Sequence, residues 1–388
     1  MTTSASPDIV PLLTNLQEIT YDIDFEEVHK WKKAHPGKKA IATFPVYVPH
    51  ELIYAFGHLP VNIYGGGEEI SISHADAILG SFICSISKST TELLLSHEPF
   101  NNAFDGFVFP FICDVARNLS GIFSRRISKP VYMLHLAQNV QSQHSIPYLT
   151  NEFQRMVKTL FPEEDLDMER LKNAITLYNE NRELYRRLYE LRSTEPWKVP
   201  LDDLYLTMRI GSNLDVVQHN ALLLEKLTKY EKSSRTKKDA IRVVVTGNFC
   251  EQPPIDIIRL IEQVGCYVID DDFMIGRRFY QTPVNVDENP LEALAAHYLK
   301  AGAKTATRFH EGEKGAVILE RVKNANADGV IFLTAKFCEP ALDDLVLHQQ
   351  ALQEQGIPSV HIEFEERGSG YENIRLSLET FVESLLFD

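Results

Sequence analysis

The sequence predicts an α/β fold with two Rossmann-like lobes, each with a mainly parallel sheet, joined by a helical segment. Near both ends of the chain, short β-branched and aromatic runs alternate with amphipathic runs, which is typical of parallel strands with crossover helices. The middle of the chain, 148–238, has a helical pattern only. A length of 388 residues is too great for one compact core of usual size, so two domains are expected.

The first lobe is expected at 39–147, after an N-terminal helical extension at 1–38 that contains a short helix at 25–33. Proline punctuates the loop after the first strand, and a glycine turn follows the second. The predicted strands are 38–49, 60–67, 104–111 and 129–136, and the predicted helices are 50–59, 75–97 and 114–126.

The helical segment, 148–238, contains a long amphipathic helix and ends in a charged linker at 231–240. One stripe of that helix is apolar and consists of Leu171, Ile175, Tyr178, Leu184, Leu188 and Leu191. The second lobe is expected at 239–388 and opens with a β-branched run, 241–249, that predicts a buried parallel strand. Its other predicted strands are 266–272, 327–335 and 358–365, and its helices are 255–265, 291–302, 316–327, 339–356 and a closing helix.

The two lobes are predicted to be copies of one unit. Two pairs of segments match in the same order, 43–57 with 246–265 and 105–109 with 328–332. Each member of the second pair is a strand that ends shortly before a cysteine, Cys113 in one lobe and Cys338 in the other. A motif order that recurs in this way indicates a duplicated lobe.

Composition excludes several classes of function. A net charge of −15, from 54 acidic and 39 basic residues, would repel a phosphate backbone, so no nucleic-acid partner is expected. No apolar run is long enough to span a membrane, and the longest, 41–56, is broken by Pro45, Pro49, His50 and Glu51. The N-terminus lacks the basic and apolar regions of a secretory signal. Five widely spaced cysteines do not suggest a disulfide framework, so a reducing cytoplasm is expected.

Three cysteines are candidate ligands. Sites in open parallel sheets form where strands end and helices begin, and Cys113 and Cys338 both follow predicted strands there. A helix N-terminus is expected to lower the pKa of a thiol. Equivalent loops of two facing lobes could direct both thiols into one cleft, and Cys84, near the start of a first-lobe helix, could complete a set of three.

Free cysteines more often fill space in a core, so an inert role is the alternative. No C-x-x-C occurs, which excludes zinc ribbons, thioredoxin-type redox sites and the usual ferredoxin spacings. Cys266 begins a strand and is expected in the core. Cys250 is also expected to be a core thiol, but it lies in a strand-end loop and is therefore the reserve ligand candidate.

Common catalytic motifs are absent from the sequence. There is no P-loop, no G-x-G-x-x-G at the start of a helix, no G-x-S-x-G and no H-E-x-x-H. ATP hydrolysis by a P-loop, nicotinamide binding, serine hydrolysis and zinc proteolysis are thereby disfavoured. The thirteen histidines lack the spacing of metal ligands.

Several charged groups remain open to two interpretations. Asp270, Asp271 and Asp272 are either a divalent metal site or, more simply, a solvated strand end. His50 and Glu51 lie at a strand-to-helix loop, where the carboxylate could move protons or merely favour the first helical turn.

Two sets of arginines are also ambiguous. Arg277 and Arg278 lie in strand-end loops, as Glu251 does, and could bind a phosphorylated substrate tail. Salt bridges to nearby carboxylates are the simpler interpretation. The arginines of the long helix are predicted to form its solvated face, and they are Arg182, Arg186, Arg187 and Arg192.

The stretch 247–273, together with Cys84 in ICSISKS, Cys113 in PFICDVARN and Cys338 in FCEPALDDL, resembles the 2-hydroxyacyl-CoA dehydratase and benzoyl-CoA reductase family. The resemblance covers nearly the whole chain. It looks closest to the smaller cluster-bearing (C or gamma) subunits of the family's ATP-dependent reductases.

The resemblance implies two similar α/β lobes and one 4Fe-4S cluster held by three cysteines. Carried over by motif, the ligands are Cys84, Cys113 and Cys338, which leaves the fourth iron open to water, hydroxide or substrate. Glu51 matches a Pro-x-Glu segment near the family's active site, which makes it a candidate catalytic residue.

The resemblance also implies partners. These are a related larger cluster-bearing subunit, ATP-hydrolysing iron–sulfur activators, ferredoxin as the indirect electron donor and a CoA thioester substrate. The implied activity is reduction of the aromatic ring of benzoyl-CoA in anaerobic metabolism. The alternatives are a dehydratase subunit that eliminates water and a non-catalytic scaffold for a related subunit.

Overall fold

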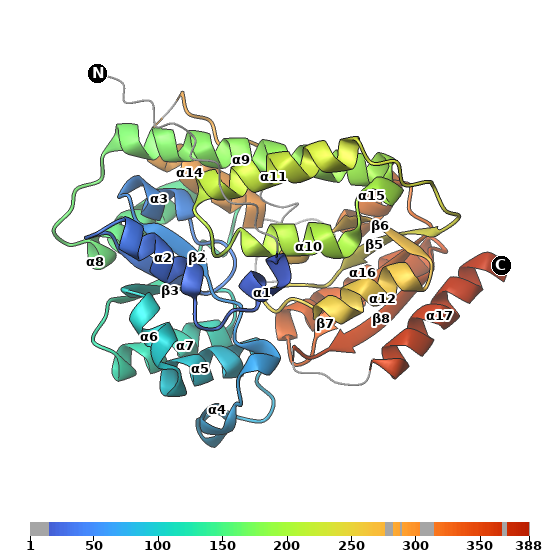
Figure 1. Cartoon of the computed structure of the whole chain (residues 1–388), viewed down its shortest axis with the longest axis horizontal. Coiled ribbons are helices and arrows are strands. Elements are labelled where there is room, and N and C mark those ends of the chain that lie inside the picture. The colour runs from blue at the N-terminus through green and yellow to red at the C-terminus, as the bar shows by residue number, and fades with distance from the viewer. Residues whose placement is uncertain (1–14, 276–281, 288, 303–313, 367–370, 388) are drawn as a thin grey trace.

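The computed structural model describes residues 15–275, 282–287, 289–302, 314–366 and 371–387. Within these ranges the strands form two four-stranded sheets, all of whose pairings are parallel, with helices packed around them (Figure 1). The predicted α/β fold class with two Rossmann-like lobes is confirmed. The strands are β1 (Ala40–Thr43), β2 (Leu59–Asn62), β3 (Gly106–Pro110), β4 (Val131–Leu134), β5 (Ile241–Thr246), β6 (Cys266–Asp271), β7 (Gly329–Ala335) and β8 (Ser359–Phe364).

The duplication predicted from the sequence is present in the topology. The first sheet has the order β2-β1-β3-β4 and the second the order β6-β5-β7-β8, so corresponding strands occupy corresponding places. The aspartate that precedes the third strand of each lobe forms the same kind of hydrogen bond. Asp105 accepts a hydrogen bond from the Ala40 amide (2.9 Å), and Asp328 accepts one from the Arg242 amide (2.8 Å). In both lobes this side chain ties the start of the first strand to the start of the third.

The helices of the first lobe follow the predicted order, with two differences. A short helix at 98–103 was not predicted. The stretch 75–97, expected to be one helical run, contains two helices separated by the non-helical residues 79–84. The break includes Gly80, a poor helix former, and it leaves Cys84 directly before the second helix. The helices are α1 (Leu16–Thr20), α2 (Glu26–Ala34), α3 (His50–Ala55), α4 (Ser73–Ile78), α5 (Ser85–Ser96), α6 (Glu98–Ala103), α7 (Asp114–Arg126) and α8 (Ser145–Leu160).

A helical layer lies across both lobes (Figure 1). It consists of α9 (Met168–Thr194), α10 (Leu201–Ile210) and α11 (Val216–Glu231). Helix α9 has 27 residues, so it is about 40 Å long. It packs against α3 of the first lobe and β6 of the second, which makes it a brace between them.

The second lobe carries the remaining helices, and one of them crosses to the first. Helix α14 packs against α8 and α9, and its Leu291, Leu294 and Tyr298 belong to the first lobe's apolar core. Helix α8 runs across the expected boundary at 147/148. The division of the chain into domains therefore remains a proposal, with α14 assigned to the first lobe. The helices are α12 (Ile255–Gln263), α14 (Pro290–Gly302), α15 (Gly315–Ala325), α16 (Glu339–Glu354) and α17 (Glu372–Phe387), and 3₁₀ turns occur at η1 (Gly67–Glu69), η2 (Pro196–Lys198) and η3 (Phe273–Ile275).

Candidate functional site

Three cysteines occupy the same kind of position in the fold. Cys84, Cys113 and Cys338 are the N-cap residues of α5, α7 and α16. Cys113 follows β3 and Cys338 follows β7, which are corresponding strands of the two sheets. The predicted placement of these two residues, between a strand end and a helix start, is confirmed.

The thiols of these residues converge on one region. Burial is the main cause that raises the pKa of Cys338, and Cys84 and Cys113 add to it. Burial likewise raises the pKa of Cys84, with a smaller addition from Cys113, so the three thiols lie within electrostatic range of one another. Cys250 interacts with all three, and its Sγ lies 3.8 Å from the Pro45 carbonyl oxygen. The four side chains also pack against one apolar cluster. The structure thus adds the reserve candidate, Cys250, to the expected three.

Cys266 lies apart from this group. Its side chain is buried in the core of the second lobe, as the sequence predicts. Burial alone raises the pKa of its thiol to about 12.

The thiols near the helix N-termini are not acidic in the metal-free chain. Burial, followed by the nearby Glu251 carboxyl group, raises the pKa of Cys84 to about 12. Burial also raises the pKa of Cys113, although the amides of Ala116 and Val115 partly offset it. The expectation that helix N-termini lower these pKa values is therefore wrong, because the cost of burying a thiolate exceeds the gain from the amides. A metal that binds here must displace the thiol protons.

The chemistry of the donor set fits the ligands that an iron–sulfur cluster uses. Within the described ranges, no three His, Cys, Asp or Glu side chains are close enough to hold one metal ion together. Thiols around a multi-iron cluster each bind a different iron, so they stand further apart than thiols that share one ion. Soft thiolate donors from both lobes are the ligands that such clusters use.

Comparison with known proteins identifies the family. The chain is 38% identical over 380 residues to the C subunit of benzoyl-CoA reductase from Thauera aromatica, an alignment that spans 96% of this chain and 98% of that protein. A family model described as "2-hydroxyglutaryl-CoA dehydratase, D-component" matches residues 45–385. The chain belongs to the 2-hydroxyacyl-CoA dehydratase and benzoyl-CoA reductase family.

Other members of this family are more distant. The (R)-phenyllactyl-CoA dehydratase beta subunit of Clostridium sporogenes is 26% identical over 353 residues, covering 90% of this chain and 92% of the relative. The (R)-2-hydroxyglutaryl-CoA dehydratase beta subunit of Acidaminococcus fermentans is 25% identical over 359 residues, covering 90% and 93%. The family resemblance inferred from the cysteine motifs is thereby confirmed.

The family's candidate acid, Glu51, is a buried anion in the first turn of α3. It forms an ion pair with Arg182 of α9, and its Oε2 accepts a hydrogen bond from the Tyr298 hydroxyl group at 3.0 Å. Burial raises the pKa of this carboxyl group, but the Arg182 guanidinium more than compensates and leaves it below its usual value. As it stands in this structure, Glu51 is ionised and has no proton to donate.

Glu51 lines a cavity of about 150 Å³ between the first lobe and the helical layer. Two wall residues, Val46 and Tyr47, have φ angles of +81° and +62°, which are strained for side chains of this kind. Tyr64, also in the wall, lies within electrostatic range of Cys250, so the cavity adjoins the thiols. Its polar lining includes His50, Asn62, Tyr178, Asn181, Arg182, Tyr185, His219 and Tyr298.

Two arginines of α9 are buried, so the prediction that all four form a solvated face is wrong for Arg182 and Arg192. The spacing of these two arginines along the helix already indicates that they face the core. Positions 171, 175, 178, 182, 185, 189 and 192 follow one helical stripe, so both arginines continue the apolar face. Arg186 and Arg187 lie off that stripe and form partly exposed ion pairs with Glu183, Glu190 and Glu231.

The three aspartates at the end of β6 are buried, and the prediction of a solvated strand end is wrong. Arg321 of α15 forms ion pairs with Asp270 (3.0 Å) and Asp272 (3.5 Å). Asp271 accepts a hydrogen bond from the Tyr189 hydroxyl group at 2.5 Å, and burial raises its pKa to about 6. The partners of these carboxylates, Arg321 and Tyr189, could not be predicted from the sequence, because α15 and α9 are far from β6 along the chain.

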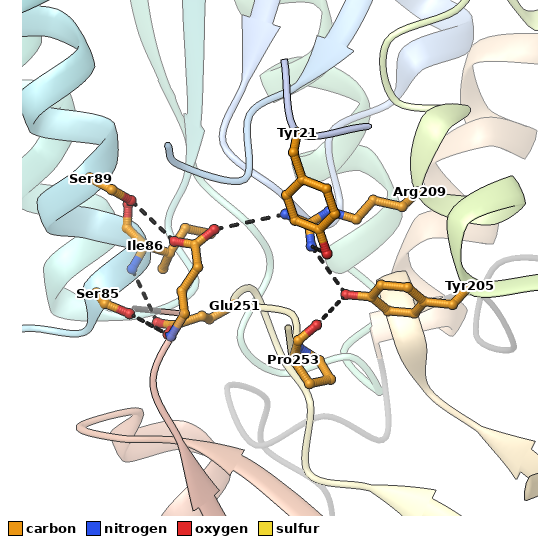
Figure 2. A network of polar contacts seen from close by, with 9 residues as sticks. Tyr21, Ser85, Ile86, Ser89, Tyr205, Arg209, Glu251 and Pro253 are labelled. Carbon is orange, nitrogen blue, oxygen red and sulfur yellow. Dashed lines mark hydrogen bonds and ion pairs between the residues drawn. The ribbon is translucent and has the colours of Figure 1, made fainter. Parts of the chain in front are cut away.

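Glu251 also proves to be buried, and it contacts the first lobe (Figure 2). Its carboxylate accepts hydrogen bonds from the Ser85 hydroxyl group and the Ile86 amide at the start of α5. The network continues to Arg209 of α10, which sequence analysis did not single out. Arg277 and Arg278, proposed as partners of a phosphorylated tail, lie outside the described residues.

No helix among the described residues is long and apolar enough to cross a membrane.

Proposed function

We propose that this chain is the smaller iron–sulfur subunit of an ATP-dependent benzoyl-CoA reductase, which reduces the aromatic ring of benzoyl-CoA to cyclohexadienoyl-CoA in an anaerobe's cytoplasm. The observation that carries the proposal is the 38% identity to the C subunit of a benzoyl-CoA reductase, against 26% and 25% to two dehydratase beta subunits. The catalytic module would also contain a related larger subunit. Separate ATP-hydrolysing activators, with ferredoxin behind them, would supply electrons.

The proposed ligands of one 4Fe-4S cluster are Cys84, Cys113 and Cys338. When bound, the cluster would supply one-electron transfer. The protein's part is to hold three thiols from two lobes beside a common apolar cluster, which limits the access of water to them. With three protein ligands, one iron remains open for contact with another molecule.

Glu51 is proposed to take part in proton movement. Tyr298 donates a hydrogen bond to it, and Arg182 holds it as an anion. As an anion it has no proton to donate until one is relayed to it, and the Tyr298 hydroxyl group is the hydrogen-bonded neighbour through which the relay would run on to the substrate. We expect Glu51→Gln to lower turnover while leaving the iron content unchanged, because Glu51 is not among the proposed ligands. Loss of iron from this variant would contradict that division of roles.

The proposed activity is tested by an assay of the native complex, purified anaerobically, with benzoyl-CoA. A reductase should consume ATP in proportion to each turnover and form the dienoyl product. The preparation should contain about four irons in this chain, as a cubane cluster requires. Colourless, iron-free protein from an iron-replete anaerobic preparation would contradict the proposal.

A dehydratase subunit is the second candidate function. The match to the dehydratase D-component model and the similarity to two dehydratase beta subunits favour it. Its reaction eliminates water and is redox-neutral overall, so ATP would be needed only in catalytic amounts, for activation. Turnover of a 2-hydroxyacyl-CoA with far less than one ATP per product would select this alternative.

A non-catalytic scaffold for a related catalytic subunit is the third candidate, and retained activity with retained iron after loss of a proposed ligand would favour it. Cys113→Ser tests it, and Cys266→Ser is the matched control because Cys266 lies in the core away from the other thiols. We expect Cys113→Ser to lose iron and activity and Cys266→Ser to retain both. If Cys113→Ser keeps its iron, Cys250→Ser in the same background would show whether Cys250 is the third ligand.

A further inference from the structure

Helix α5 begins at Cys84 but receives no capping hydrogen bond from that residue. The Cys84 side chain makes no capping hydrogen bond, and its Sγ lies 3.2 Å from the Ser87 hydroxyl oxygen. Burial raises the pKa of its thiol, and the Ser87 hydroxyl group and amide partly offset this. Helix α7 differs, because the Cys113 sulfur accepts a hydrogen bond from the Ala116 amide at 3.4 Å. The Ser87 amide bonds to the Cys84 carbonyl oxygen at 3.1 Å, whereas the Ile86 amide, one position earlier, needs an acceptor from elsewhere.

Glu251 of the second lobe supplies that acceptor (Figure 2). Its Oε2 accepts a hydrogen bond from the Ile86 amide at 3.1 Å, and its Oε1 accepts one from the Ser85 hydroxyl group. The Glu366 amide, which follows β8, donates a further bond to Oε1 at 2.9 Å. The Glu251 side chain is only 2% exposed, so these donors stand in place of water.

Glu366 adds a second contact between the second lobe and α5. Its Oε2 accepts a hydrogen bond from the Ser89 hydroxyl group at 3.2 Å, and its Oε1 lies 3.8 Å from a guanidinium nitrogen of Arg209. The space beside Ser89 is full, because a Cβ atom on Gly65 would stand 2.2 Å from the Ser89 hydroxyl oxygen. The first two turns of α5 are thus held against the second lobe.

We propose that Glu251 is a positioning residue for Cys84. It joins the Cys84 end of α5 to the loop that carries Cys250, and so fixes Cys84 relative to the thiols of the second lobe. Because Glu251 accepts the hydrogen bond of the Ile86 amide, the Cys84 thiol is not needed for that bond and is left available for a ligand. The inference deepens the proposed function, since it concerns the thiols proposed to hold the cluster.

The first test uses the metal-free chain and does not require a cluster. Wild type and Glu251→Ala are treated with iodoacetamide under anaerobic, chelating conditions, and the modification of each cysteine is followed by mass spectrometry. We expect Cys84 to react about tenfold faster in Glu251→Ala than in wild type, and also faster than in Glu251→Gln, which removes the same charge from beside the thiol but keeps an acceptor for Ile86. Cys266 should react at the wild-type rate. Asp256→Asn, an exposed carboxylate change in the neighbouring helix α12, is the matched control.

An unchanged rate at Cys84 would overturn the proposal. An equal acceleration at Cys84 and Cys266 would also overturn it, because it would show general destabilisation. Glu251→Gln is the conservative variant. Its amide oxygen can still accept from Ile86, but its NH₂ group cannot accept from Ser85 or Glu366, so a rate between those of wild type and alanine is expected.

The second test uses the native complex and reads the cluster itself. We expect Glu251→Ala to lower iron per chain or to change the electron paramagnetic resonance spectrum of the reduced protein, with Glu251→Gln partly restoring the wild-type values. Full iron with an unchanged spectrum would overturn the proposal. If wild type itself holds no iron, the proposed function fails, while the alkylation test still decides the role of Glu251.

Discussion

His219 shows how burial sets the charge of one side chain. It lies under the helical layer with both ring nitrogens bonded, Nε2 to the Thr207 carbonyl oxygen at 3.0 Å and Nδ1 to the Asn181 amide nitrogen at 3.1 Å. This network assigns a neutral ring that donates from Nε2 and accepts at Nδ1. Burial lowers the pKa of the ring to about 4, despite the favourable Thr207 contact.

A pH dependence of stability follows from this histidine. Between pH 6.5 and 4 the unfolded chain binds a proton at the ring and the folded chain does not, so the free energy of unfolding falls as the pH falls. The loss from this residue between pH 8 and pH 5 is about 2 kcal/mol. We expect His219→Gln to be less stable at pH 8 but to lose about 2 kcal/mol less on acidification, as measured by urea unfolding. Parallel pH profiles would contradict this.

Substitution of Arg192 tests how much a buried charge contributes to stability, because its guanidinium group is fully buried. Its guanidinium donates to the Val268 and Val199 carbonyl oxygens and pairs with Glu262 at 3.2 Å. We expect Arg192→Ala to lower the free energy of unfolding by about 3 kcal/mol or more, since it leaves these acceptors without donors. Arg187→Ala, on the same helix, should change it by less than about 1 kcal/mol. Equal effects would show that burial of Arg192 does not matter.

The position and charge state of a residue could be predicted from the sequence where its near neighbours along the chain determine them. The strand-end positions of Cys113 and Cys338 follow from the chain order of strands and helices. The burial of Asp270 does not, because its partner Arg321 lies on another element. The raised thiol pKa values were missed for the same reason, since the desolvation of Cys84 depends on how the lobes pack.

At the scale of elements, α9 depends on a defined start. Asp167 is its N-cap, and its carboxylate accepts hydrogen bonds from the Glu169 amide at 2.9 Å and the Arg170 amide at 3.2 Å. We expect Asp167→Ala to lower the free energy of unfolding by about 1 kcal/mol, as N-cap substitutions typically do. Asp165→Ala, an exposed change in the same loop, is the control, and thermal unfolding measures both. Identical stabilities would show that the cap contributes nothing.

The order and type of the elements were predictable, and the break before Cys84 was not. Helix α7 and strand β7 match their predicted ranges closely because apolar periodicity and flanking residues agree there. Around Gly80 the apolar pattern stays compatible with a helix, and the low helix propensity of one glycine is not enough to predict that 79–84 is non-helical. That break decides where Cys84 lies.

At the scale of the whole molecule, the lobes are interlocked rather than merely adjacent. Helix α14 follows the second lobe's β6 in sequence but packs in the first lobe's core, where the Tyr298 and Phe153 rings meet edge to face at 6.0 Å. The family resemblance and the internal repeat predict two lobes. Neither predicts this exchange, because periodicity shows which face of α14 is apolar but not which lobe it covers.

Interlocking should keep the protein together when the chain is cut. We expect that cleavage at a specific protease site inserted in the exposed linker 232–240 leaves two fragments that elute together in gel filtration. Leu294→Asp, which places a charge in the first lobe's core, should separate the fragments or prevent folding of the uncut chain. Fragments that separate without that substitution would show that α14 does not hold the lobes together.

The late position of α14 in the sequence also determines when the first lobe can complete its folding during synthesis. A ribosome extends a chain at about 5–20 residues per second, and N-terminal domains usually fold as they emerge. Here the first lobe waits for Leu291–Tyr298 before its core is complete, and Cys338 emerges later still. Cys84 and Cys113 are therefore made early but reach their final surroundings only when the chain is nearly finished. Binding of the proposed cluster by all three thiols would then come only after Cys338 has emerged.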